Sequence, residues 1–208
     1  MTTVTTVFVP IDATARSLGA DAVAAALVRE AAARGEAVQV VRNGTRGMCW
    51  LEPLVEVATP AGRMAYGPVE VDDVAGLFAA GFLRGGSHPL GHGRTEDIAY
   101  FKHQERLTFA RVGLGDPLDL ATYEAHGGLR GLRNALTLSG AEVVEAVVRS
   151  GLRGRGGAAF PAGIKWRTVA ATQADRKYVC CNADEGDSGT FSDRMLMEGD
   201  PYCLLEGM

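Results

Sequence analysis

The chain has 208 residues, of which 47% are hydrophobic and 22% charged, and its net charge is −4. This composition is typical of a globular protein with one sizeable domain or two small ones, and the acidic balance excludes a basic face for nucleic acid. No apolar run approaches the roughly 20 residues of a membrane span, and the N-terminus lacks the basic start and apolar core of a signal peptide. We therefore expect a cytoplasmic protein with neither a nucleic-acid nor a membrane partner.

The first part of the chain predicts a small sheet with helices. Four short runs rich in β-branched or aromatic residues predict strands, the last two joined as a hairpin. They are residues 4–9, 37–41, 54–58 and 63–66. Residues 21–34 predict an amphipathic helix that Asp21 can cap and Gly35 ends, and residues 72–82 predict another. The order β-α-β then β-β-α favours a thioredoxin-like α/β sandwich.

A glycine-rich stretch, residues 81–94, is predicted to be a linker. It contains His88 and His92, but two histidines without further ligands do not make a metal site. We place a domain boundary near residue 95, which gives one domain of residues 1–95 and a second of residues 96–208.

The second domain begins with helical segments. Residues 106–112 predict a strand or an extended arm, and residues 119–126 and 129–136 predict short helices. Residues 139–142 read S-x-x-E, a capping box that opens a helix, and Gly151 ends that helix.

The four cysteines do not form a ligand or disulfide framework, because none belongs to a C-x-x-C pair. Residues 178–181 form an apolar run that predicts a buried strand. Its adjacent Cys180 and Cys181 are interpreted as small buried hydrophobes.

A glycine-rich loop, GRGGAAFPAG, occupies residues 154–163 and leads into a helix predicted from about Ala162. Its glycines let a phosphate approach the backbone, and the helix N-terminus and Lys165 add positive charge. Because the loop follows a helix and lacks G-x-x-x-x-G-K-[ST], both the Rossmann and the P-loop interpretations are disfavoured. A tight turn with Phe160 in the core is the alternative. The candidate binding residues are Gly154, Arg155, Gly156, Gly157, Ala158, Phe160, Gly163 and Lys165.

An acidic loop, NADEGDSGTF, follows the apolar run. Carboxylates repel phosphates but accept hydrogen bonds from ring N–H, ribose hydroxyl or carboxamide groups. An exposed acidic turn is the alternative. The candidates are Asn182, Asp184, Glu185 and Asp187. Together the two loops predict a site for a flavin or nicotinamide nucleotide, with no catalytic acid or base and no metal ligand among these residues.

The motifs GRGGAAFPAGIKW and NADEGDSGTFSDR resemble those of the flavin subunit of NADH dehydrogenases, the 51-kilodalton-type subunit of complex I. The family patterns are G-R-G-G-A-G-F-P-T-G-x-K-W and N-A-D-E-x-x-x-G-[ST]-F-x-D-R, and the resemblance spans about residues 107–208. It implies that FMN and NAD are cofactors. Four positions depart from complex I members: Ala159 replaces Gly, Ala162 replaces Thr, Thr168 replaces a stacking Phe, and Asp187 replaces Glu.

The resemblance also implies a role for each matching position. Glycines 154, 156 and 157 and Lys165 would hold the phosphate side of FMN. Asn182 and Asp184 would bind the flavin and ribityl portion, and Phe160 would stack on a ring of NAD(H).

The first domain resembles the thioredoxin-like ferredoxin module of the small NADH-side subunit of complex I, which holds a [2Fe–2S] cluster with four cysteines. Residues 10–19 carry no cysteine here, and the second ligand segment keeps only Cys49. One thiolate cannot hold such a cluster. The expected fold class is therefore α/β: a thioredoxin-like module without its iron–sulfur cluster, then the start of the FMN-binding α/β domain.

Fusion of the two domains and the GDSGTF variant look most like the β subunit of NAD-dependent, molybdenum-containing formate dehydrogenase. The alternative is the diaphorase subunit of NAD-reducing hydrogenase or the NADH-oxidising subunit of complex I. An alternative of another class is a truncated, non-catalytic assembly subunit. The formate dehydrogenase resemblance implies a molybdenum/iron–sulfur catalytic subunit and a small [2Fe–2S] subunit as partners. Relatives continue into a [4Fe–4S] motif whose ligands lie outside this sequence. We therefore expect a fragment that alone binds FMN weakly or not at all and is active only in the full-length assembly.

Overall fold

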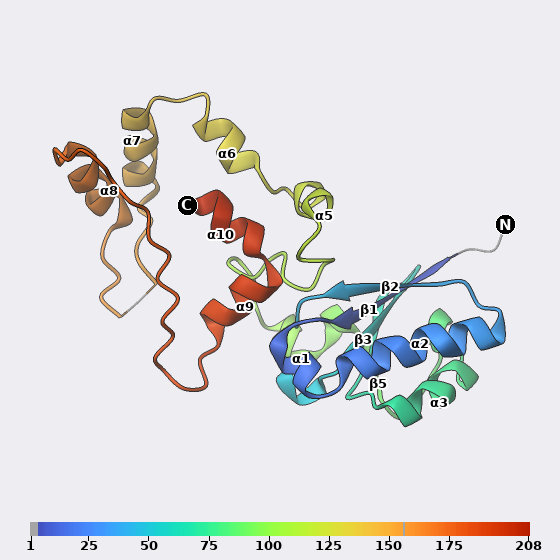
Figure 1. Ribbon diagram of the computed structural model, residues 1–208. Coiled ribbons are helices and arrows are strands. Elements are labelled where there is room, and N and C mark those ends of the chain that lie inside the picture. The colour runs from blue at the N-terminus through green and yellow to red at the C-terminus, as the bar shows by residue number, and fades with distance from the viewer. Residues whose placement is uncertain (1–3, 156) are drawn as a thin grey trace. The chain divides into compact units, whose positions relative to one another are not determined.

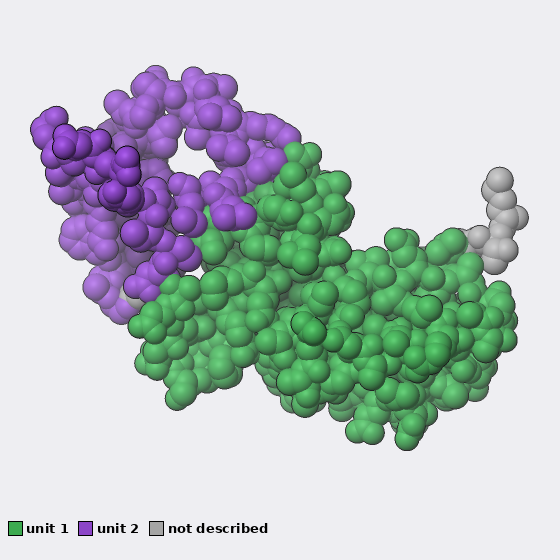
Figure 2. Space-filling view, viewed as in Figure 1, with its two compact units in different colours: residues 1–126, 183–204 green, residues 127–182, 205–208 purple. Residues whose placement is uncertain are grey.

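The computed structural model describes residues 4–155 and 157–208, and it divides into two compact units (Figure 2). The sheet unit contains residues up to His126 together with Ala183–Leu204. The helical unit contains Gly127–Asn182 and Leu205–Met208. The boundary predicted near residue 95 therefore falls inside the sheet unit.

A five-stranded mixed sheet forms the centre of the sheet unit, in the order β2-β1-β3-β4-β5 (Figure 1). Strands β1 and β2 run parallel, and the remaining neighbours are antiparallel. The strands are β1 (Thr5–Pro10), β2 (Val38–Asn43), β3 (Val55–Thr59), β4 (Gly62–Tyr66) and β5 (Gly91–Arg94). The four predicted strands and the predicted α/β class are confirmed.

Helices α1 (Ala13–Ser17), α2 (Ala20–Arg34) and α3 (Val74–Ala79) accompany this sheet. Side chains of β1, β3, α2 and α3 share one core, in which Val7, Leu27 and Leu77 are fully buried. Because strand side chains alternate between faces, Val55 and Val57 of β3 enter this core and Glu56 points to the other face.

Helix α2 begins differently from the prediction. Gly19, at φ 98°, occupies the N-cap, and Asp21 lies in the first turn, where it pairs with Arg16 at 2.9 Å and Arg42 at 2.7 Å. A carboxylate there still favours the positive end of the helix. Gly35 ends the helix at φ 67°, as predicted.

The linker prediction for residues 81–94 is wrong at its end, because Gly91–Arg94 pairs with β4 as the fifth strand. None of these residues favours a strand by itself, so the pairing depends on the free edge of β4. His92 lies here too, with its Nε2 2.7 Å from the carbonyl oxygen of Gly67.

The strand or extended arm predicted over residues 106–112 is absent, since most of this stretch consists of turns and bends. Val112 in it is fully buried. A Cβ on Gly199 would lie 2.6 Å from Val112 Cγ1, and a Cβ on Gly44 would lie 2.9 Å from Gly199 Cα. These close approaches pack helix α9 (Ser192–Gly199) against the end of β2.

The remaining helices agree largely with the sequence. Asp119 caps the predicted helix after it, and Ser139 and Glu142 form the predicted capping box.

Helix α10 contains residues of both units, because the division falls after Leu204. The helices are α4 (Ala99–Lys102), α5 (Leu120–Ala125), α6 (Arg130–Ala135), α7 (Gly140–Ser150), α8 (Ala162–Ala171) and α10 (Pro201–Gly207).

The buried strand predicted over residues 178–181 is absent. Tyr178 is 74% exposed and Val179 67%, and both Cys180 and Cys181 are exposed rather than buried. A strand needs a neighbour to receive its backbone hydrogen bonds, and the described residues of the helical unit contain no other strand.

A buried polar network lies on the second face of the sheet, centred on Glu56, whose side chain is 1% exposed. Arg46 donates from Nε and Nη2 to the two carboxylate oxygens, at 3.2 and 3.1 Å. Thr95 Oγ1 donates at 2.8 Å and Asn43 Nδ2 at 3.2 Å. Removing one partner of such a buried ion pair costs about 3–5 kcal/mol, so Glu56 is a major determinant of this unit's stability.

A second buried carboxyl, Glu52, gives the sheet unit a pH dependence. Burial raises the pKa of Glu52 to about 7, although hydrogen bonds from Thr45 Oγ1 and the Leu54 N–H act in the opposite direction. The folded state thus binds this proton more tightly than the unfolded chain does. Its stability contribution is fully present below the ordinary pKa of 4.5 and is lost as the pH rises through about 7.

We predict that the free energy of unfolding falls between pH 5 and pH 8 by on the order of 2–3 kcal/mol, and that Glu52→Gln removes most of this fall. Urea unfolding of both proteins at the two pH values measures the difference. An equal pH dependence in the variant would show that Glu52 is not the group responsible.

Candidate functional site

The glycine-rich loop connects α7 to α8 and is closed at its base by backbone contacts. Residues Arg153 and Pro161 form a β-bridge, and the Ala162 N–H donates to the Leu152 oxygen at 2.8 Å. Arg153 Nε also donates to the oxygen of Ala159, at 2.6 Å. These contacts hold the two ends of the loop together. Gly156, a candidate residue, lies outside the described residues.

Gly154 plays a narrower role than the sequence suggests. Its N–H donates to the oxygen of Phe160 at 2.8 Å, so this amide is committed to closing the loop. A phosphate bound here must take its amide donors from later residues. Arg155, Gly157 and Ala158 are exposed around the tip of the loop.

Gly163 serves packing rather than binding. A Cβ at this position would lie 2.6 Å from Val148 Cα, closer than any real side chain comes to backbone. The glycine therefore permits close contact between α8 and α7. Arg167 on α8 adds an exposed ion pair to Glu145 on α7, at 3.0 Å.

Phe160 and Lys165 lie together at the start of α8. The Lys165 ammonium is 5.7 Å from the centroid of the Phe160 ring, which is 45% exposed. Phe160 is therefore not a core residue of the helical unit, and the alternative of a tight turn with a buried Phe160 is wrong. An exposed ring and a cation beside a helix N-terminus suit an anionic ligand with a planar group.

The acidic loop is organised by Glu185, which caps α9. Its carboxylate accepts hydrogen bonds from Ser192 Oγ at 2.9 Å and from the N–H groups of Asp193 at 3.0 Å and Arg194 at 3.3 Å. Desolvation acts to raise the pKa of Glu185, but these hydrogen bonds outweigh it and hold the pKa below its ordinary value. The predicted ligand-binding carboxylate is, in this structure, the N-terminal cap of a helix.

The other candidates in this loop are exposed. Asn182 belongs to the helical unit, whereas Asp184 and Asp187 belong to the sheet unit. The backbone oxygen of Asp187 accepts from the Thr190 N–H at 3.2 Å, which forms a turn that leaves the Asp187 side chain in solvent. The two candidate loops thus fall in different compact units.

Arg194 was not among the candidates, yet it fastens the acidic loop to the sheet unit. It donates from Nη2 to Thr14 Oγ1 at 2.7 Å, and its guanidinium lies 4.4 Å from the centroid of the Phe191 ring. Its place in the motif NADEGDSGTFSDR was the available signal, but the partner on α1 could not be read from the sequence.

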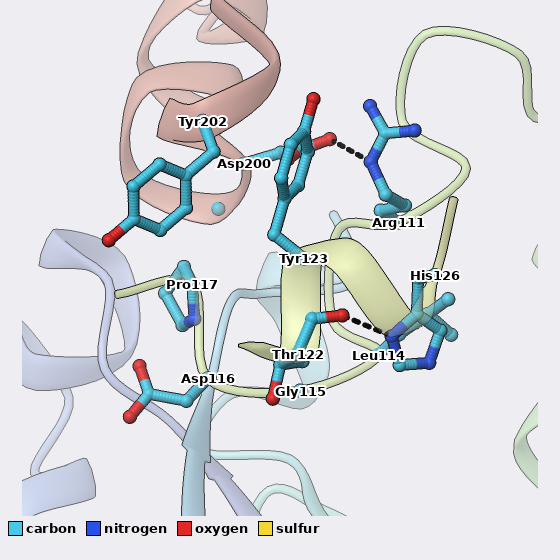
Figure 3. Close-up of a pocket in the computed structure, with 11 residues that line it drawn as sticks. Arg111, Leu114, Gly115, Asp116, Pro117, Thr122, Tyr123, His126, Asp200 and Tyr202 are labelled. Carbon is cyan, nitrogen blue, oxygen red and sulfur yellow. Dashed lines mark hydrogen bonds and ion pairs between the residues drawn. The ribbon is translucent and has the colours of Figure 1, made fainter. Parts of the chain in front are cut away.

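A small hollow of about 20 Å³ in the sheet unit shares no residue with either motif (Figure 3). Arg111 pairs with Asp200 at 2.9 Å inside it, and the Tyr123 and Tyr202 rings face each other at 5.6 Å. Tyr202 donates from its hydroxyl to the Leu118 oxygen. The residues that line the hollow thus bind one another, and they pack α5 against the start of α10.

No metal site is present in the described part of the chain, where no three His, Cys, Asp or Glu side chains group together. None of the four cysteines forms a disulfide bond. Among the same residues, no helix is both long and apolar enough to cross a membrane.

Comparison with known protein families finds a match for the C-terminal part of the chain. Residues 147–208 match the Nuo51 FMN-binding domain. This match contains both candidate loops, from before Gly154 to beyond Arg194.

Curated relatives match about half of the chain. NADP-reducing hydrogenase subunit HndC of Solidesulfovibrio fructosivorans is 50% identical over 107 residues, which are 51% of this chain and 22% of the relative. An NADH-quinone oxidoreductase subunit of Rhizobium meliloti is 51% identical over 105 residues, 50% and 25% of the two chains. The alpha subunit of the NAD-reducing hydrogenase HoxS of Cupriavidus necator is 48% identical over 115 residues, 55% and 18%. The matched region thus spans about a quarter or less of each relative.

The structure gives Ala159 an unusual backbone. Its φ is 43°, in the left-handed region, and this is the position at which the resembling family has glycine. An L-residue pays about 1–2 kcal/mol for that conformation, which glycine adopts without strain.

We predict that Ala159→Gly slows hydrogen exchange of the α8 amides about threefold, since the relieved strain exceeds the added entropy of the unfolded chain. Ala158→Gly is the matched control, because Ala158 has no positive φ, and it should speed exchange. If both variants speed exchange equally, the strain at Ala159 is not real.

Proposed function

We propose that this chain contributes part of an FMN and NAD(H) site in a diaphorase-type oxidoreductase, which passes electrons between NAD(H) and iron–sulfur clusters. The match of residues 147–208 to the Nuo51 FMN-binding domain carries this proposal. The names of two relatives, an NADH-quinone oxidoreductase and an NAD-reducing hydrogenase, support NAD(H) as the second ligand.

The glycine-rich loop fits the phosphate end of FMN. It combines an exposed loop tip, the N-terminus of the ten-residue helix α8 and the ammonium of Lys165. Gly157 and Lys165 would hold the phosphate, with Gly156 as a further candidate from the motif. Gly154 and Gly163 act by shaping the loop, through the Phe160 hydrogen bond and the contact with Val148.

The polar end of the site is assigned to the acidic loop. Asn182 and Asp184 would accept hydrogen bonds from the flavin and ribityl groups, and Phe160 would stack on a ring of NAD(H). Glu185 shapes the part of the acidic loop that carries Asp184, because it caps α9. Asp187 is exposed on a turn and would lie near the nicotinamide, one methylene shorter than the Glu of complex I members.

FMN, when bound, supplies the exchange between two-electron and one-electron transfer that side chains cannot perform. The chain's own residues bind and orient the nucleotides. None of them needs to donate or accept a proton.

Formate is the electron source that we propose for the whole assembly. The fused thioredoxin-like domain and the GDSGTF variant of the acidic loop support it. The partners would then be a molybdenum/iron–sulfur catalytic subunit and a small [2Fe–2S] subunit, in the cytoplasm, with a [4Fe–4S] cluster bound outside this sequence. Hydrogen is the second candidate, because relatives named as hydrogenase subunits match about half of this chain.

The test is NAD⁺ reduction by the purified native assembly, with formate and hydrogen offered separately. We predict formate-dependent reduction that requires bound FMN. If NAD⁺ is reduced with hydrogen but not with formate, hydrogen is the electron donor of the assembly, and the proposed diaphorase role of the chain is unchanged. If NAD⁺ is not reduced by either donor and NADH reduces no artificial acceptor, the chain is an assembly subunit and the proposal fails.

A further inference from the structure

A second hollow in the sheet unit has the chemistry of an anion site. It measures about 250 Å³, opens to solvent, and is lined by Arg46, Glu96, Phe101 and Arg106, among others. It lies on the sheet face that carries the Glu56 network, and it shares no residue with either motif loop.

Arg106 is the unusual member of this lining. Its Nη1 is buried and has no hydrogen-bond partner among the described residues. Its guanidinium carbon lies 4.7 Å from the centroid of the Phe101 ring. Burial lowers the pKa of Arg106, and the nearby Arg46 lowers it further, yet an arginine stays protonated in proteins. A buried, charged donor without an acceptor is rare unless something else supplies the acceptor.

Arg46 adds a second cationic edge. Its Nε and Nη2 are held by Glu56, but its Nη1 lies 3.8 Å from Glu96 Oε1, which is beyond hydrogen-bond distance. Its guanidinium carbon is 5.7 Å from the same Phe101 ring. Two guanidinium groups therefore lie near one aromatic ring, and Arg106 has a buried N–H group without an acceptor.

Glu96 does not neutralise the positive charges of Arg46 and Arg106. Its side chain is 60% exposed, so its negative charge is largely screened by solvent. Water could offer Arg106 an acceptor but no charge. An oxyanion offers both, and the planar fork of arginine matches phosphate and carboxylate oxygens.

We propose that this hollow binds the oxyanion group of a small molecule, a phosphate or a carboxylate, through Arg106 Nη1 and the free edge of Arg46. Glu96 competes with that ligand for Arg46. The site is independent of the FMN site and of the proposed function.

The test is isothermal titration of the intact protein with inorganic phosphate, and separately with acetate, at constant ionic strength. We predict saturable binding of at least one of the two, and which one binds distinguishes a phosphate from a carboxylate site. Arg106→Lys keeps the positive charge but lacks Nη1, and should weaken binding at least about tenfold. Glu96→Gln removes the competing charge and should tighten binding about threefold.

Arg29→Ala is the control, since Arg29 is an exposed arginine on α2, and it should leave binding unchanged. Glu96→Gln alters only an exposed side chain, so its effect can be measured even if an Arg106 variant folds poorly. Absence of saturable binding, or equal binding in wild type, Arg106→Lys and Glu96→Gln, would overturn the proposal.

Discussion

The buried carboxylate of Glu56 is the constraint on which the sheet unit depends. It accepts hydrogen bonds from the end of β2, from the segment after it and from the start of the 95–114 stretch, through Asn43, Arg46 and Thr95. Gly113 extends the network, because its oxygen accepts from Asn43 and from Arg63. One charge on the central strand thereby fastens a long stretch without strands to the sheet. The desolvation cost of burying this carboxylate is offset by the ion pair and the hydrogen bonds that it accepts.

The same network bears on the prediction that the first domain lacks the iron–sulfur cluster of the module it resembles. In the module that the first domain resembles, cysteines after the first two strands hold the cluster. Here the segment after β2 carries two buried polar residues. Thr45 donates a hydrogen bond to the Glu52 carboxylate, and Arg46 forms an ion pair with Glu56. Buried ion pairs and hydrogen bonds thus occupy the stretch in which the related module carries metal ligands. Cys49, the one cysteine of this segment, lies at the end of the segment and is exposed.

Features set by neighbouring residues could be predicted from the sequence, and features set by distant partners could not. The capping box at Ser139 and the glycine ends of α2 and α7 involve only adjacent turns. Strand β5 depends on the edge of β4, so its glycines gave no signal. The apolar run at residues 178–181 has no neighbouring strand among the described residues of the helical unit and forms no strand itself. Glu185 was recognised as a motif residue, but its role as a cap depends on the turn that returns the chain to Ser192.

The central claim is that the two motif loops bind one flavin. Hydrogen exchange of the native assembly, compared with the same assembly stripped of FMN, tests it most directly, because bound ligand slows exchange of the amides that it covers. The account predicts slower exchange in residues 154–165 and also in residues 182–191 when FMN is bound. Slower exchange in only one of these stretches, or in neither, would contradict it.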